Sequence, residues 1–164
     1  MKKMRVTFLV VVCLFASIAV ATSGAHFFSA NGTVLDNGQL AVSFDEAGVG
    51  QQTVNYTLSG NAEYAWGCIN GGGNHPQATN KETSNTPVST GASFTPNNGR
   101  VQGTIVTTPA PQPPSGFSCP SGQTLVLASA TYTGMILTDT TNGASISQAD
   151  MTGTFSRIFF TFRK

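Results

Sequence analysis

The central part of the chain alternates between apolar and polar positions. In QLAVSF (39–44) and TVNYTL (53–58), every second residue is a large apolar one. A period of two predicts β-strands that turn one row of side chains toward a core, and no segment has the period of 3.6 and the caps of a helix. Five further segments have strand character: AEYAWGC (62–68), PVSTGASF (87–94), RVQGTIVTT (100–108), TLVLASATYTGMILT (124–138) and GTFSRIFFTF (153–162). The pattern predicts an all-β fold, an antiparallel β-sandwich.

Turn signals separate these segments. Asn37 and Gly38 tolerate positive φ and suit a tight hairpin turn between strands. The segment PAPQPPSGFSCPSG (109–122) holds five of the eight prolines. Proline donates no ladder hydrogen bond, so this segment is not a central strand. We expect an extended surface crossover between two sheets of one domain, because the 42 residues that follow are too few for a second domain.

Residues 1–25 are predicted to be a signal peptide. Met1–Arg5 is basic, Val6–Val20 is apolar, and small residues follow. At about 1.5 Å per residue, this apolar run is too short for the roughly 30 Å hydrocarbon core of a membrane. The segment therefore predicts a secreted protein, extracellular or on the cell surface, with no membrane attachment after cleavage.

Two cleavage points satisfy the rule of small residues before the cut. Cleavage after Ala25 makes His26 the first residue, and cleavage after Ala21 makes it Thr22. The first leaves a conventional polar stretch behind the apolar run, so we expect a single mature domain at 26–164. Three of the eight cations leave with the signal, and the mature net charge is 5 − 7 = −2.

Charge is scarce in this chain. Only 9% of the residues are charged, whereas soluble domains average about 25%. The surface must then be built from neutral Ser, Thr, Asn, Gln and Gly. A net charge near zero gives no field to attract nucleic acid, so the expected partner is an extracellular ligand such as a polysaccharide, and not a nucleic acid.

Cys68 and Cys119 are the only cysteines outside the signal segment. In an oxidising compartment such a pair predicts one disulfide, and a two-cysteine metal site is the alternative. Closing a loop of about 50 residues stabilises a fold by roughly 4 kcal/mol in the chain-entropy model.

In a strand over 62–68, Tyr64, Trp66 and Cys68 share one face. A tryptophan packed near a disulfide resembles the core of immunoglobulin-like domains, which implies that topology or a related Greek key. Two departures are that Trp66 precedes both cysteines and that Phe117, two residues before Cys119, lacks the hydroxyl of a tyrosine corner.

The motifs of catalysis are missing from the sequence. It has no GxSxG elbow, and the triple glycine at 71–73 is followed by no Lys-Ser or Lys-Thr pair. Asp45 and Glu46 are adjacent, so in a strand they point to opposite faces and cannot flank one glycosidic bond. Asp36 and Asp139 lie in turn signals and are expected to be turn residues, with a weak calcium site as the alternative. The chain is predicted to be more a binding module than an enzyme.

The two histidines offer one metal hypothesis. With cleavage after Ala25, His26 presents both an α-amino group and an imidazole, and His75 can add a third nitrogen. Three nitrogens in this arrangement suit tetragonal Cu(II), which is similar to the histidine brace of copper-dependent polysaccharide monooxygenases. That resemblance implies a copper cofactor for transport or oxidative chemistry. The alternative is that His26 begins an edge strand and His75 lies in a polar loop, with no cofactor.

Carbohydrate binding is a further hypothesis. Tyr56, Tyr64, Trp66 or Tyr132 would form a stacking platform if exposed, and core packing is the default for such residues. The triplets at Asn31 and Asn55 are possible glycan acceptors and indicate surface positions.

Three segments resemble small secreted bacterial proteins of uncharacterised function. They are AHFFSANGTV (25–34), CINGGGNHPQATNKET (68–83) and SCPSGQTLVLASATYTGMILTDTTNG (118–143). The resemblance implies export and a β-rich fold with one disulfide. The sequence therefore predicts a secreted non-enzymatic binding or surface module of unknown ligand; the alternatives are a copper protein and a carbohydrate-binding module.

Overall fold

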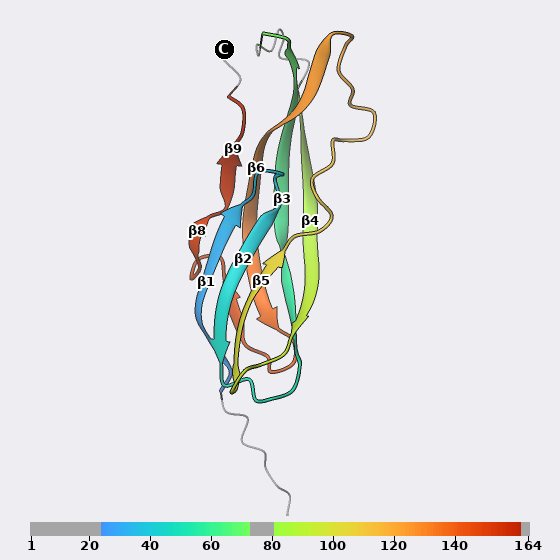
Figure 1. The fold of residues 1–164 in the computed structure, drawn as a ribbon. Coiled ribbons are helices and arrows are strands. Elements are labelled where there is room, and N and C mark those ends of the chain that lie inside the picture. The colour runs from blue at the N-terminus through green and yellow to red at the C-terminus, as the bar shows by residue number, and fades with distance from the viewer. Residues whose placement is uncertain (1–23, 73–80, 162–164) are drawn as a thin grey trace, which may run out of the picture.

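A computed structural model describes residues 24–72 and 81–161 of the chain (Figure 1). These residues form nine strands and no helix. The strands are β1 (His26–Val34), β2 (Leu40–Ala47), β3 (Val54–Asn70), β4 (Lys81–Phe94), β5 (Arg100–Val106), β6 (Gln123–Asp139), β7 (Ser145–Ser147), β8 (Thr152–Thr154) and β9 (Ser156–Ile158). The all-β prediction is confirmed. The predicted signal segment lies outside the described residues except for Gly24 and Ala25, and within the described residues no helix is long and apolar enough to cross a membrane.

The strands form two sheets that face each other across an apolar core. The four-stranded sheet has the order β5-β2-β1-β8, and the five-stranded sheet has the order β4-β3-β6-β7, with β9 also pairing with β6. Every pair is antiparallel except β1–β8, which is parallel. The antiparallel prediction is thus right for the five-stranded sheet and wrong for one edge of the other. The reason is that β8 follows a strand of the opposite sheet, so no hairpin dictates its direction.

One of the two longest strands joins two segments that the sequence analysis treated as separate strands. The segments at 53–58 and 62–68 belong to one strand, β3, because a bulge between Ser59 and Asn61 absorbs the polar interruption. Gly60 lies at this bulge because the thioether of Met135 packs against it. β3 therefore pairs with β4 over 54–67 and with β6 over 56–70.

The last predicted strand, 153–162, is instead divided. β8 joins the four-stranded sheet and β9 joins the five-stranded sheet, with Phe155 between them. The ring of Phe155 packs against Gly32 so closely that a Cβ at Gly32 would lie 2.5 Å from Phe155 Cζ. Burial of this ring explains why the chain changes sheet there.

The inner faces follow the alternation of the sequence. Leu40, Val42 and Phe44 of β2 are buried, as are Val54, Tyr56 and Leu58 of β3. At one end of the core, aromatic rings from both sheets meet; Phe44 and Tyr56 have centroids 4.6 Å apart, and Phe94 lies 5.5 Å from Phe44. Such clusters bury large apolar areas and fix the packing of the sheets.

A buried polar network joins the two sheets. The hydroxyl of Tyr132, on β6, donates to the carbonyl of Gly38 at 2.8 Å and lies 3.0 Å from the hydroxyl of Tyr64, on β3. It also lies 3.3 Å from Oγ1 of Thr107, which accepts the amide of Leu40 at 3.0 Å. Gly38 is in the β1–β2 turn and has a φ of +84°, as its place in a tight turn requires.

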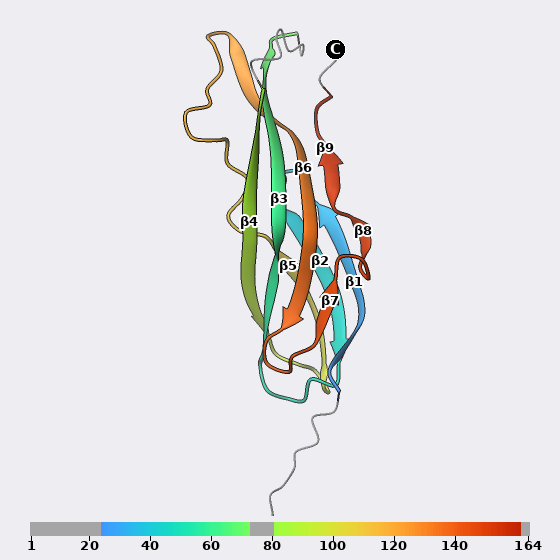
Figure 2. The same cartoon turned by 180° about the vertical axis from the view of Figure 1, so that it is seen from behind.

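The proline-rich segment at 107–122 connects β5 to β6 and so crosses between the sheets, as predicted. Both views show it running beside β4 (Figures 1 and 2). At its start, the amide of Thr108 donates to Oγ1 of Thr90, on β4, at 2.9 Å. Near its end, Cys119 forms the predicted disulfide with Cys68 of β3, with Cα atoms 5.6 Å apart.

Replacing Tyr132 with Phe should lower the free energy of unfolding by about 1–3 kcal/mol, because it leaves the buried carbonyl of Gly38 without its donor. Tyr64→Phe removes only one bond of the network and should cost about 1 kcal/mol or less. Urea unfolding measures both. An equal loss of unfolding free energy in the two variants would contradict the conclusion that Tyr132 contributes more to the network than Tyr64 does.

Removing the disulfide should lower the free energy of unfolding by roughly 4 kcal/mol, because it releases a cross-link over 51 residues of sequence. Urea unfolding of the double variant Cys68→Ser/Cys119→Ser measures the loss. Reductant should destabilise the wild-type protein by the same amount and leave the variant unchanged. A variant as stable as the oxidised protein would contradict the expectation.

Candidate functional site

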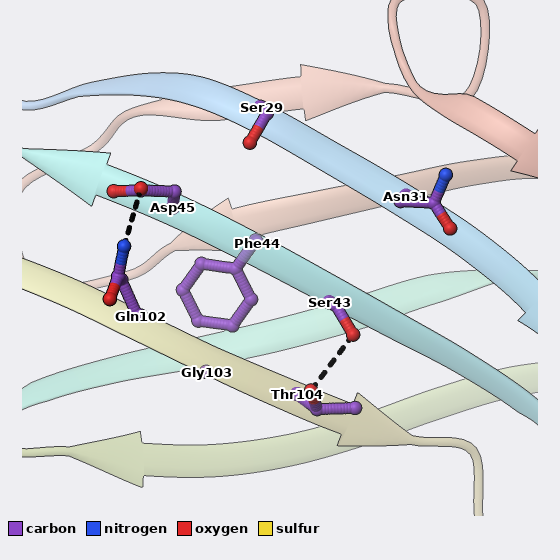
Figure 3. Close-up of a pocket in the computed structure, with 8 residues that line it drawn as sticks. All are labelled: Ser29, Asn31, Ser43, Phe44, Asp45, Gln102, Gly103 and Thr104. Carbon is purple, nitrogen blue, oxygen red and sulfur yellow. Dashed lines mark hydrogen bonds between the residues drawn. The ribbon is translucent and has the colours of Figure 1, made fainter.

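The outer face of the four-stranded sheet presents a compact group of polar side chains. Alternation along β1, β2 and β5 sends the apolar residues into the core and the polar ones outward. We call the outward group the polar sheet face (Figure 3); it consists of Ser29, Asn31, Ser43, Asp45, Gln102 and Thr104. The group lines a shallow hollow of about 500 Å³.

The register of the strands sets these side chains in two rows. Asp45 is paired with Ser29 on one side and with Gln102 on the other. One step along, Ser43 lies between Asn31 and Thr104 in the same way. Neighbouring strands lie about 4.8 Å apart, so each row offers three polar groups at a regular spacing.

Hydrogen bonds hold most of these side chains in one orientation. Oγ of Ser43 lies 2.9 Å from Oγ1 of Thr104, and Nε2 of Gln102 donates to Oδ2 of Asp45 at 2.8 Å (Figure 3). Nδ2 of Asn31 donates to Oγ1 of Thr152, on β8, at 3.0 Å. The face is therefore organised before any ligand arrives, which lowers the entropy cost of binding.

The single acid of the face is neutralised by Arg100, at the start of β5. Nε of Arg100 donates to Oδ1 of Asp45 at 2.6 Å, and its second nitrogen donates to Oδ2, a bidentate pair. These bonds, and then the one from Gln102, lower the pKa of Asp45 below its usual range. The face thus carries no net charge.

An exposed aromatic ring stands beside the polar sheet face. A bulge between Phe27 and Ser29 leaves Phe28 unpaired, and its side chain is 61% exposed. The guanidinium carbon of Arg100 lies 5.2 Å from the centre of this ring, and the His26 ring lies 4.7 Å away, edge to face. Sequence reasoning missed Phe28 because a bulge has no signature in the alternation of residues.

The aromatic residues proposed as a stacking platform are in the core instead. Tyr56, Tyr64, Trp66 and Tyr132 are all buried, so none can stack on a sugar. Their default assignment to the core is confirmed. The exposed ring is Phe28, whose neighbours are outward-facing residues.

The histidine brace stays a prediction. His26 is exposed at the start of β1, and its Nδ1 lies 2.8 Å from the carbonyl of Gly24. His75 lies outside the described residues, so its distance from His26 is untested. Over 24–72 and 81–161, no three His, Cys, Asp or Glu residues are grouped to hold a metal ion.

The remaining acids lie largely where the sequence placed them. Asp45 and Glu46 point to opposite faces of β2, as expected for neighbours in a strand. Asp139 is the last residue of β6 and caps the turn that follows: its Oδ1 accepts hydrogen bonds from the amides of Thr141 and Asn142 at 2.7 and 2.9 Å. Asp36, in the β1–β2 turn, forms an exposed ion pair with Arg157 at 2.6 Å.

No protein-family model matches the chain, and no curated protein or solved structure is similar enough to it to count as a match.

Proposed function

We propose that the mature chain is an exported, non-enzymatic module that binds neutral carbohydrate through the polar sheet face. The observation that carries the proposal is the fixed, uncharged set of hydroxyl and amide groups in the hollow. Sugars are recognised by such groups, because each sugar hydroxyl both donates and accepts a hydrogen bond.

The ligand class follows from charge and from Phe28. The pairing of Asp45 with Arg100 leaves no free cation on the face to attract phosphate or an acidic polymer. Phe28 supplies an apolar ring at the rim, against which the C–H face of a sugar ring can pack. A neutral polysaccharide satisfies both features.

Binding without turnover is supported by the state of Asp45. Hydrolysis of a glycosidic bond needs two carboxyl groups that face each other across the substrate. Among the residues that line the hollow, Asp45 is the single carboxylate, and both of its oxygens already accept hydrogen bonds. It is therefore unsuited to act as an acid or a base.

Export is part of the proposal and is supported by two features. Residues 1–25 have the composition of a signal peptide. The Cys68–Cys119 disulfide is of the kind that persists in oxidising surroundings. Secretion, to the medium or the cell surface, would bring the face to extracellular polysaccharide.

We also propose an immunoglobulin-like Greek-key topology for the sandwich. It is supported by two pairings between strands three apart in the chain, β2 with β5 in one sheet and β3 with β6 in the other. Trp66 is buried on β3, as the tryptophan of such domains is buried on the corresponding strand. The disulfide differs, since it ties β3 to the crossover and not to a strand of the opposite sheet.

Affinity electrophoresis of the purified 26–164 domain in gels that contain a β-glucan, a mannan or an α-glucan tests the function. We expect retardation by at least one neutral polymer and none by polygalacturonate. Gln102→Ala and Phe28→Ala should each weaken binding about 3- to 10-fold, the value of one neutral hydrogen bond or one ring contact.

Asn61→Ala is the matched control, because Asn61 is exposed on β3 of the other sheet. Its retardation should equal that of the wild-type protein. Absence of retardation by every neutral polymer, or equal retardation of the Gln102 and Phe28 variants and the wild type, would overturn the proposal. Release of reducing sugar by the purified domain would overturn the assignment as non-enzymatic.

A further inference from the structure

Glu46 is an acid in the interior of the sandwich. It follows Phe44 on the inner face of β2, and its side chain is fully buried, with an exposure of 0%. In the described part of the chain, no group forms a hydrogen bond of normal geometry with either of its carboxyl oxygens. An ionised carboxylate in such a place would lose its hydration without replacement, which is costly.

Three titratable groups face Glu46 from the strands packed around it. Tyr56, on β3, and Asp139, at the end of β6, are buried and come from the opposite sheet. His26, on β1, is exposed and affects the pKa of Glu46 through its charge. Asp45 and Arg100 lie on the other face of the sheet and pair with each other.

The two buried carboxyl groups cannot both be ionised at low cost, because like charges at close range in an apolar interior repel strongly. Asp139 already accepts hydrogen bonds at both oxygens, from the amides of Thr141 and Asn142 and from Nδ2 of Asn142. Asp139 thus has donors for both of its oxygens, whereas Glu46 has none, so Glu46 is the carboxyl group on which a proton removes an uncompensated charge.

A metal ion fits this place poorly. Calcium takes six to eight oxygen ligands, whereas Glu46 and Asp139 supply two carboxyl groups, and N–H donors already point at Asp139. Over the residues that the structure describes, no third His, Cys, Asp or Glu completes a metal site. The ligand that fits two facing carboxyl groups is a proton.

We propose that Glu46, with Asp139 as its neighbour, is an interior proton-binding site that is filled when the sandwich folds. This inference is independent of the carbohydrate site, which lies on the outer face of the same sheet.

The burial of Glu46 and the lack of hydrogen-bond partners at its carboxyl oxygens agree with a raised pKa. Burial raises its pKa from 4.5 to about 7, and the negative charge of Asp139 acts in the same direction; the Tyr56 hydroxyl and the charge of His26 oppose the rise. The folded state therefore holds the proton more tightly than the unfolded state does.

The sign of the pH dependence follows. The contribution of Glu46 to stability is complete below pH 4.5 and is lost as the pH rises through about 7. From well below pH 4.5 to well above pH 7, the full difference corresponds to a roughly 300-fold fall in the folding equilibrium constant. The domain should thus be most stable in mildly acidic surroundings.

Urea unfolding of the 26–164 domain between pH 4.5 and 8 tests the site. The wild-type folding constant should fall by up to about 300-fold, and Glu46→Gln, which keeps the shape without the titration, should remove that fall. The two proteins differ at this residue alone, so the difference between their pH profiles isolates Glu46. Asp45→Asn, a change at the neighbouring residue, should retain the wild-type dependence.

A second measurement works on the wild-type protein even if the variant fails to fold. The chain has three glutamates, Glu46, Glu63 and Glu82, and the last two are exposed. With ¹³C-labelled glutamate, one carboxyl signal should titrate near pH 7. Absence of any glutamate signal that titrates near pH 7 would overturn the site.

Addition of calcium distinguishes a bound proton from a bound metal ion at Glu46. Addition of calcium or of a chelator should leave the melting temperature and the glutamate signals unchanged. A calcium-dependent rise in melting temperature that Glu46→Gln abolishes would show a metal site and overturn the proton assignment, as would a wild-type stability that does not change between pH 4.5 and 8.

Discussion

The hydroxyl of Tyr132 is the point at which the two sheets are held in one relative position. It reaches from β6 to the β1–β2 turn at Gly38 and lies against Thr107, just after β5, so two connections of the opposite sheet meet at one atom. A buried hydroxyl and carbonyl have no water to replace a lost partner, which makes this geometry costly to change. The contact therefore helps to fix how the four-stranded sheet, which carries the polar sheet face, packs on the five-stranded sheet.

Neighbouring acids on β2 show how strongly position decides chemistry. Asp45 points outward, where Arg100 and Gln102 stabilise its ionised form. Glu46, one residue later, points inward, where burial favours the neutral form. The side chains differ by one methylene group, so their difference in behaviour comes from the sheet that separates them and not from the residues themselves.

Period-two alternation predicted the all-β class and most strand positions. The Asn37-Gly38 pair predicted the hairpin turn, and the two cysteines outside the signal segment predicted the Cys68–Cys119 bridge. The same alternation places Glu46 in the buried row, because it lies an even number of residues after Leu40, Val42 and Phe44. Sequence reasoning did not use this position to predict a buried acid. The exposed ring of Phe28 and the continuity of β3 arise from bulges, which depend on partner strands far away in the chain. The parallel edge of β8 depends on the route of the chain between sheets, which local alternation does not encode.

The crossover at 107–122 has a consequence for how the molecules behave toward one another. β4 is the outer strand of its sheet, and an outer strand can pair with a strand of another molecule unless something covers it. The crossover lies along β4, is bonded to Thr90 and is tied down by Cys119, while Pro87 removes one donor from the strand itself. Because few charges keep copies of this protein apart, this covering removes one route to self-association through β4. The disulfide thus holds the crossover over β4 as well as stabilising the fold. Its reduction would expose this edge to pairing with other copies of the protein, in addition to lowering the free energy of unfolding.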